Sequence, residues 1–179
     1  MTGGAELQTA RLLLRPLTTR DAEAVALHAG DFDVARMTAR IPHPYSITEA
    51  FRWISSIAEE EFVRGIAYEG DIVGVAAYAR DGENASEAEI GYWIGKPFWG
   101  QGIATEAAHA VALHAFDDAG LKRLTSSHFT DNPASGNVLR KLGFRQTGKC
   151  KVWCQARLQE IEAVQYDLVR RRLKRLRKR

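Results

Sequence analysis

The stretch from Glu89 to Ala107, EIGYWIGKPFWGQGIATEA, constrains the fold of this chain more than any other segment. It predicts a strand that ends near Ile94, a loop with glycines at 95, 100 and 102, and a helix that follows directly. Glycines let backbone N–H groups approach a ligand closely, and the positive end of the helix dipole faces the same point. A helix N-terminus of this kind is suited to a phosphate or pyrophosphate.

The glycine spacing separates this loop from two common nucleotide-binding motifs. It matches neither G-x-x-x-x-G-K-[ST] nor G-x-G-x-x-G, so it predicts neither a nucleoside-triphosphate site nor a dinucleotide site. Glycines that only shape a strand-to-helix turn would explain the loop about equally well. On this stretch alone, both interpretations stay open.

The charge of the chain is unevenly distributed. The last ten residues, RRRLKRLRKR, hold eight of the 25 Lys and Arg residues and no acidic residue. The other 169 residues carry 17 basic and 22 acidic groups, so the body of the protein is mildly acidic. The sequence pI of about 9.0 therefore does not indicate a basic nucleic-acid-binding domain.

Several other classes of protein are disfavoured. The N-terminal residues lack the pattern of a signal peptide, and the most apolar helical stretch, 107–116, is too short to span a bilayer. Cys150 and Cys154 have a C-x-x-x-C spacing, which matches neither a redox motif nor half of a zinc site. We therefore expect reduced thiols, no metal site, no membrane contact and a cytoplasmic protein.

Apolar runs, capping residues and turn residues predict one α+β domain. Its sheet would be mixed and mostly antiparallel, with about seven strands flanked by about four helices. Ser46 and Glu49 form an S-x-x-E capping box that opens the second helix. The predicted strands are 11–17, 62–68, 71–79, 87–94, 124–129, 144–152 and 160–169, and the predicted helices are 21–28, 46 to about 62, 102–119 and 133–142.

A second segment decides between the two interpretations of the loop. Residues 130–144 read TDNPASGNVLRKLGF, with Asn and Ser ahead of a short helix. Together the two segments resemble the GNAT acetyltransferase superfamily, specifically its ribosomal-protein N-terminal acetyltransferase branch (RimJ/RimL type). The opening QTARLLLRPLT and the order of elements are also similar, so the resemblance covers the chain up to about Val169. It implies a GNAT acyl-CoA N-acyltransferase fold over 1–169 and a basic tail over 170–179.

The resemblance also implies where acetyl-CoA would bind. The superfamily's pyrophosphate loop, [RQ]-x-x-G-x-[GA], falls on residues 99–104, with Trp99 in place of the usual Arg or Gln. Backbone N–H groups must therefore do the binding. Many relatives have Arg where this chain has Asn137. The implied cofactor-binding residues are Tyr92, Trp93 and Ile94 on the strand, Gly100, Gln101, Gly102, Ile103, Ala104 and Thr105 at the helix start, and Asn132 and Asn137 across the cofactor arm.

Glu89 is the candidate catalytic base. An α-amino group has a pKa near 8, so a modest base that acts through water suffices to deprotonate it, whereas lysine demands more. Glu89 would lie on the strand that splays to admit the cofactor. A solvated strand carboxylate is the competing interpretation, since Glu87 lies on the same face. A backbone N–H near Ile94 would meet the oxyanion.

Ser135 is the candidate acid for the leaving thiolate. Many GNAT enzymes use a tyrosine four residues before the glycine of the L-G-F motif, but this chain has Leu139 there. In the RimJ/RimL branch the implied acid is the serine three residues after the asparagine, which is Ser135. Ser135 would also serve well as a cap for the short helix after Pro133, and the two roles can coexist.

The leading prediction is therefore an acetyl-CoA-dependent N-acetyltransferase with direct attack in a ternary complex. A protein N-terminus is the first choice of acceptor, and a small amine such as an antibiotic or a polyamine is the second. The competing class is a ribosome- or RNA-binding module that has lost catalysis. The tail Arg170–Arg179 is either a solvated end or an electrostatic tether to ribosomal RNA. The sequence leaves the oligomeric state open and is compatible with a homodimer.

Overall fold

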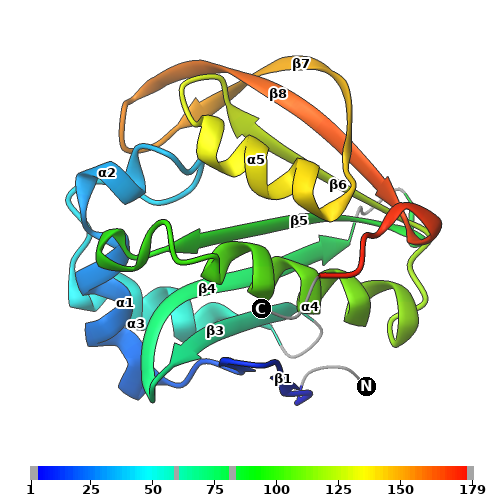
Figure 1. Ribbon diagram of the computed structural model, residues 1–179. Coiled ribbons are helices and arrows are strands. Elements are labelled where there is room, and N and C mark those ends of the chain that lie inside the picture. The colour runs from blue at the N-terminus through cyan, green and yellow to red at the C-terminus, as the bar shows by residue number, and fades with distance from the viewer. Residues whose placement is uncertain (1–3, 59–60, 81–83, 177–179) are drawn as a thin grey trace.

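The computed structural model describes residues 4–58, 61–80 and 84–176, and these form one α+β unit with an eight-stranded mixed sheet (Figure 1). The strand order is β1-β2-β3-β4-β5-β6-β8-β7. The strands are β1 (Leu7–Gln8), β2 (Leu12–Arg15), β3 (Phe62–Tyr68), β4 (Asp71–Arg80), β5 (Glu87–Ile94), β6 (Arg123–Phe129), β7 (Arg145–Cys154) and β8 (Gln159–Val169).

Helices cover both faces of this sheet. Helices α4 and α5 pack on one face, and α1 and α3 pack on the other (Figure 1). The helices are α1 (Ala22–Ala29), α2 (Phe32–Ala35), α3 (Ile47–Ser56), α4 (Ile103–Asp117) and α5 (Pro133–Leu142), with 3-10 turns η1 (Thr19–Asp21), η2 (Lys96–Phe98) and η3 (Arg170–Arg172).

The sheet parts in its middle, between β5 and β6. These neighbours are parallel and pair over three residues, from Glu87 opposite Arg123 to Glu89 opposite Thr125. Beyond that point β5 continues to Ile94 and β6 to Phe129 without further pairing between them, and Figure 1 shows the two strands diverging. We call this region, residues 90–94 of β5 and 126–129 of β6, the β5–β6 splay.

Two apolar clusters hold the layers together. The larger one joins the sheet to α4 and α5 and includes Ile90, Val111 and Leu139. The smaller one joins α1 and α3 to the other face at β3 and β4. Because the small residues Ala107, Ala108, Ala112 and Ala115 of α4 are fully buried, this helix lies close against the sheet.

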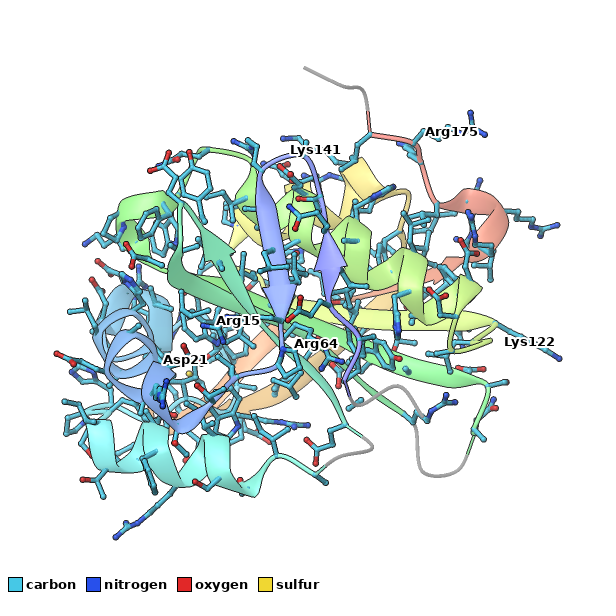
Figure 2. All side chains as sticks on the ribbon, turned by 90° about the horizontal axis from the view of Figure 1, so that it is seen from below. Arg15, Asp21, Arg64, Lys122, Lys141 and Arg175 are labelled. Atoms are coloured by element: carbon cyan, nitrogen blue, oxygen red, sulfur yellow. The ribbon has the colours of Figure 1, made fainter. Side chains whose placement is uncertain are left out.

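Three charged side chains, one of them partly exposed, lie in or beside this packed interior. Arg64 of β3 is 1% exposed, lies near the middle of the molecule and has its guanidinium 3.9 Å from the ring centre of Phe62 (Figure 2). Arg15 and Asp21 point toward each other and form an ion pair of 2.7 Å (Figure 2). The hydrogen bond from Arg15 holds the pKa of the Asp21 carboxyl below its usual value, so the pair stays charged at neutral pH.

Several residues of the basic tail between Arg170 and Leu176 contact the domain. Arg170 donates two hydrogen bonds to Asp117 at the end of α4, at 2.6 and 3.0 Å. The backbone N–H of Lys174 donates to the carbonyl of Leu142 at the end of α5. Leu173 and Leu176 contact the larger apolar cluster. The division into a domain over 1–169 and a tail over 170–179 stays a prediction, and residues 177–179 lie outside the described part of the chain.

The fold class predicted from the sequence is confirmed, with differences in detail. The structure adds β1 and α2, which have two and four residues and are too short for a periodic pattern. Helix α3 ends at Ser56 rather than near Phe62. The hydroxyl of Ser56 donates to the carbonyl of Trp53, and Ile57 has extended backbone angles, so the helix cannot continue.

Candidate active site

The edge of β5 that faces the β5–β6 splay presents backbone groups without a strand partner. In an antiparallel pair, hydrogen-bonded and non-hydrogen-bonded residues alternate. The N–H of Gly95 donates to Val73 of β4, so the backbone groups of Ile94, Tyr92 and Ile90 point away from β4, toward β6. The backbone groups of Trp93 point toward β4 instead. Trp93 therefore differs from Tyr92 and Ile94, the other two strand residues that the resemblance implies for cofactor binding.

Two side chains hold the ends of this exposed edge. At the inner end, the Ser126 hydroxyl donates to the carbonyl of Ile90 at 2.9 Å. At the outer end, the Trp99 indole N–H donates to the carbonyl of Ile94 at 2.7 Å. Between these two contacts, the N–H and C=O of Tyr92 and the N–H of Ile94 face the splay. An extended amide-containing chain could pair with them as a strand would.

The loop that follows β5 leaves the start of α4 open. Gly100 and Gly102 have φ values of +77° and +79°, a left-handed conformation that favours glycine. A side chain at Gly100 would meet no atom within 4 Å, so the loop faces open space. Gly102 is the N-cap and provides no side-chain hydrogen bond. Within the described residues no side chain accepts from Ile103, Ala104 or Thr105, which suits an anion at this helix N-terminus.

A network outside the splay fixes this loop. Arg11, before β2, donates to the Gln101 carbonyl at 3.1 Å and to Glu106 of α4 at 2.9 Å. Thr9 donates to the same carboxylate at 2.7 Å. Burial opposes ionisation of Glu106, but the hydrogen bonds from Thr9 and Arg11 outweigh it, and its pKa lies below the usual value. Sequence reasoning missed this support, because 95 residues separate Arg11 from Glu106.

The two carboxylates that share a face of β5 differ in their surroundings. Glu87 accepts from Asn84 at 2.9 Å and forms an ion pair with Arg123 at 3.0 Å. Glu89 is exposed, and no hydrogen bond or ion pair reaches its carboxylate from the described part of the chain. Glu89 is also the last β5 residue paired with β6, so it stands where the two strands part. Of the two, only Glu89 is free to act on a third molecule.

At the start of α5, Asn132 takes the capping role that the sequence had offered to Ser135. The Asn132 side chain accepts from the Ser135 N–H at 3.2 Å, so Asn132 is the cap of this helix. The Ser135 hydroxyl lies 3.1 Å from the hydroxyl of Tyr92, across the splay. Burial raises the pKa of the Tyr92 phenol well above its usual value. Asn137 is exposed and accepts from Arg140 on the outer side of the helix.

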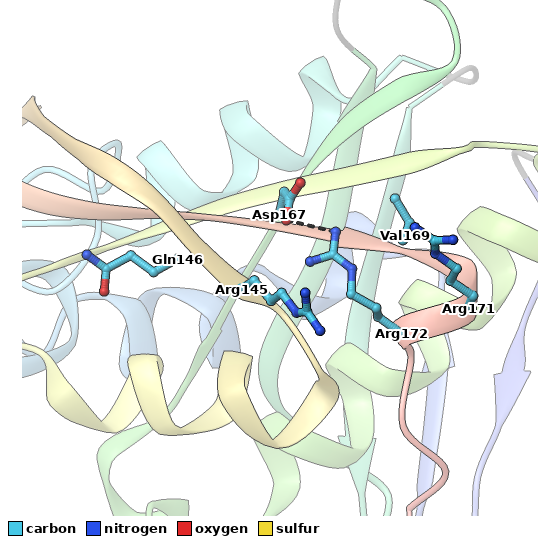
Figure 3. Close-up of a pocket in the computed structure, with 6 residues that line it drawn as sticks. All are labelled: Arg145, Gln146, Asp167, Val169, Arg171 and Arg172. Atoms are coloured by element: carbon cyan, nitrogen blue, oxygen red, sulfur yellow. Dashed lines mark hydrogen bonds and ion pairs between the residues drawn. The ribbon is translucent and has the colours of Figure 1, made fainter.

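A separate hollow of about 570 Å³ lies outside this site, along β7, β8 and the tail (Figure 3). Its lining includes Arg145, Arg171 and Arg172, and its carboxylate, Asp167, is bound by Arg172 at 2.9 Å and by Arg123 at 3.3 Å.

In the described residues, no group of three or more His, Cys, Asp and Glu side chains is arranged to hold a metal ion. No helix in that part of the chain is long and apolar enough to cross a membrane.

Comparison with known proteins identifies the family. The Acetyltransferase (GNAT) domain family matches residues 11–145. The chain is 32% identical over 149 residues to the uncharacterised N-acetyltransferase YoaA of Bacillus subtilis, covering 79% of this chain and 84% of that protein. It is 34% identical over 83 residues to the ribosomal-protein-serine acetyltransferase of Escherichia coli, covering 46% of each. The structure of Mycobacterium smegmatis RimJ with CoA-disulfide superposes with a TM-score of 0.80 at 22% identity, covering 96% of this chain and 88% of that one.

The chain therefore belongs to the GNAT acetyltransferase family. It is an N-acetyltransferase that uses acetyl-CoA, as the sequence predicted. The geometry fits this co-substrate, because the open start of α4 suits a pyrophosphate and the free edge of β5 suits an amide-containing arm. The roles of the individual site residues stay predictions.

Proposed function

We propose that this enzyme acetylates the α-amino group of a protein N-terminus by direct attack across the β5–β6 splay. The observation that carries the proposal is the pair of polar sites on the two faces of the sheet at this splay. Glu89 projects on one face with a free carboxylate, and the hydroxyls of Tyr92 and Ser135 meet on the other. Two reactants that approach from opposite faces would meet where the strands part.

The chain's own groups would divide the work as follows. Acetyl-CoA supplies the activated acetyl group. The N–H groups of Ile103, Ala104 and Thr105 would hold its pyrophosphate, and the backbone N–H and C=O of Tyr92 would hold its arm. Glu89 would take the proton of the amine through water, since it lies on the order of 10 Å along the strand from Tyr92. The N–H of Ile94 would stabilise the oxyanion, and Ser135 the leaving thiolate.

The choice of an α-amino acceptor has two supports. A modest base suffices for an amine whose pKa is near 8, and a single exposed carboxylate is a modest base. The ribosomal-protein-serine acetyltransferase of Escherichia coli, similar over 83 residues, has a protein rather than a small amine as the acceptor in its name. A small amine is the alternative acceptor, because the family match does not distinguish enzymes that acetylate proteins from enzymes that acetylate small amines.

A panel of acceptors tests the proposal. Peptides that begin with free Ser or Ala would be compared with the same peptides blocked at the N-terminus and carrying an internal Lys, and with a polyamine and an aminoglycoside. Acetylated products would be measured by mass spectrometry. Preference for free N-termini supports the proposal, whereas preference for the polyamine or aminoglycoside establishes the small-amine alternative.

Glu89→Gln tests the base within the same panel. Turnover should fall on the order of a hundredfold at neutral pH and recover as the pH rises, because the amine then loses its proton unaided. Glu87→Gln is the matched control, since it removes a carboxylate from the same strand face that is already held by Arg123. A Glu89→Gln enzyme with the wild-type pH profile would make Glu89 a structural carboxylate.

We further propose that the basic tail brings the enzyme to ribosomal RNA. Arg170 and Arg172 are engaged with Asp117 and Asp167, so the hollow beside the tail offers Arg145 and Arg171 to a phosphate. Arg145→Gln with Arg171→Gln should weaken co-sedimentation with ribosomes at low salt and leave peptide acetylation unchanged. Equal co-sedimentation of this variant and the wild type would contradict the tether. Deleting the whole tail is a poorer test, because it would also remove the contacts of Leu173 and Lys174 with the domain.

A further inference from the structure

Tyr92 carries a hydroxyl group across the β5–β6 splay, from the middle of β5 to the first turn of α5. Its oxygen lies 3.1 Å from the Ser135 hydroxyl oxygen and 3.3 Å from the Ser135 carbonyl oxygen. Its ring packs against the larger apolar cluster. The resemblance implied that Tyr92 binds the cofactor and gave its hydroxyl no role, because nothing in the sequence connects this side chain with a residue 43 positions away.

The Tyr92 phenol has a single hydrogen and two acceptors within reach, the carbonyl oxygen and the hydroxyl oxygen of Ser135. In the hydroxyl pair, either oxygen can be the donor. Burial raises the pKa of Tyr92, so the phenol keeps its proton at all pH values at which the enzyme would work. The Ser135 N–H is already bound by Asn132, which holds the backbone in place. When the Ser135 hydrogen turns toward a departing sulfur, the Ser135 oxygen can accept the hydrogen of Tyr92.

We propose that Tyr92 is a positioning residue that orients the Ser135 hydroxyl so that its hydrogen points into the splay, toward the departing sulfur. This inference rests on the proposed function of Ser135. In the reaction, the amine nitrogen bonds to the acetyl carbon, the amine proton passes through water to Glu89, and the carbon–sulfur bond breaks with its electron pair on sulfur. Ser135 then donates a hydrogen bond to the thiolate, which Tyr92 keeps aligned.

Tyr92→Phe tests the inference, because it removes one oxygen and keeps the ring. Turnover of a peptide with a free N-terminal Ser should fall about five- to tenfold, the value of one oriented hydrogen bond, with little change in KM for acetyl-CoA. Ser135→Ala should lower turnover at least as much. The double variant should be no slower than Ser135→Ala alone, because Tyr92 acts through Ser135.

Tyr78→Phe is the matched control. Tyr78 is also a buried tyrosine of the central sheet, and its hydroxyl lies 3.3 Å from His114 rather than beside the splay. Thermal unfolding of each variant would separate loss of stability from loss of turnover. Tyr78→Phe should keep the wild-type turnover, and a matching fall in both Phe variants would overturn the inference.

A second measurement needs no acceptor. The complex with CoA would be alkylated with iodoacetamide across a pH series, and the modified CoA would be measured after release from the protein. A hydrogen bond to the thiolate lowers the pKa of the bound thiol. Its reaction midpoint should therefore lie at lower pH in the wild type and Tyr78→Phe than in Tyr92→Phe or Ser135→Ala.

The outcomes separate this inference from the proposed function. If Ser135→Ala changes turnover and the thiol midpoint while Tyr92→Phe changes neither, the positioning role is wrong and the role of Ser135 stands. If neither variant changes either quantity, the role of Ser135 fails and the inference fails with it. Additive losses in the double variant would show that Tyr92 acts independently, which also overturns the inference.

Discussion

Helices α4 and α5 lie on the same face of the sheet and begin in opposite ways. At α5, Pro133 occupies the first position and has no N–H, and the Asn132 side chain accepts from the Ser135 N–H at 3.2 Å. At α4, the N-cap is Gly102 in a left-handed conformation, with no side-chain hydrogen bond. One helix satisfies its first donors from its own sequence, and the other leaves them for a ligand.

This difference shows how one fold separates structural from functional helix ends. Helix α3 is closed as α5 is, by the reciprocal hydrogen bonds of Ser46 and Glu49. The acidic residue in the first turn of α4, Glu106, does not cap its own helix but accepts from Arg11 and Thr9. The open N-terminus of α4 is therefore held in place by residues that precede β2 in the chain.

Closing α4 with a negative charge should have the largest effect. Gly102→Glu places a carboxylate where the pyrophosphate is expected, and acetyl-CoA affinity should fall at least about a hundredfold. Gly102→Ala is the matched control, since it adds the same left-handed strain, of about 1 kcal/mol, without charge. Calorimetric titration measures the acetyl-CoA affinity of both variants. Unchanged affinity in Gly102→Glu would refute the anion site, and equal losses in both variants would assign the effect to strain.

Removing the N-cap of α5 should have a smaller effect, and this effect should be on the stability of the fold. Asn132→Ala removes the cap and should cost about 1 kcal/mol, which lowers Tm by about 2–4 °C. Asn132→Asp keeps the accepting oxygen, so its Tm should stay near that of the wild type. If Asn132 also contacts the cofactor arm through its amide N–H, Asn132→Asp should weaken acetyl-CoA binding. An Asp variant as unstable as the Ala variant would show that the cap is not what Asn132 provides.

Weakening the contacts of Arg11 and Thr9 with Glu106 of α4 should have the smallest effect. Glu106→Gln should cost about 0.5–1 kcal/mol at neutral pH, because the Arg11 partner is half exposed. The folded-state pKa of Glu106 is lowered, so its contribution is present above the unfolded value near 4.3 and is lost as the pH falls through the folded value. Urea unfolding at pH 7 and at pH 3 checks this. If the difference in unfolding free energy between the wild type and Glu106→Gln were larger at pH 3 than at pH 7, this prediction would be contradicted.

Local signals explain which parts of the structure could be predicted. Strand β5 and helix α5 run over the predicted residues, because the glycine loop and Pro133 fix their ends within a few positions. The β3–β4 hairpin also follows the sequence, since Glu69 and Gly70 both have the positive φ that its tight turn requires. Each of these features depends on neighbours in the chain.

The rest depends on pairings that the sequence does not display. Tyr92 meets Ser135 across 43 residues, and Arg11 meets Glu106 across 95. Glu87 and Glu89 look alike in the sequence and differ because Asn84 and Arg123, the latter from the parallel neighbour β6, bind the first. Alternation of side chains along β5 could have separated the carboxylate face from the Tyr92 face, but the hydroxyl pair required the position of α5.

The most direct test of the open helix end is backbone amide NMR during titration with CoA and with pantetheine, which lacks the pyrophosphate. CoA should shift the N–H signals of Ile103, Ala104 and Thr105 strongly, and pantetheine should shift those of Tyr92 and Ile94 while leaving α4 in place. The Glu49 N–H, already bonded to Ser46 at 3.2 Å, is the internal reference for a closed helix end. CoA binding that leaves the three α4 amides at their free positions would contradict the account.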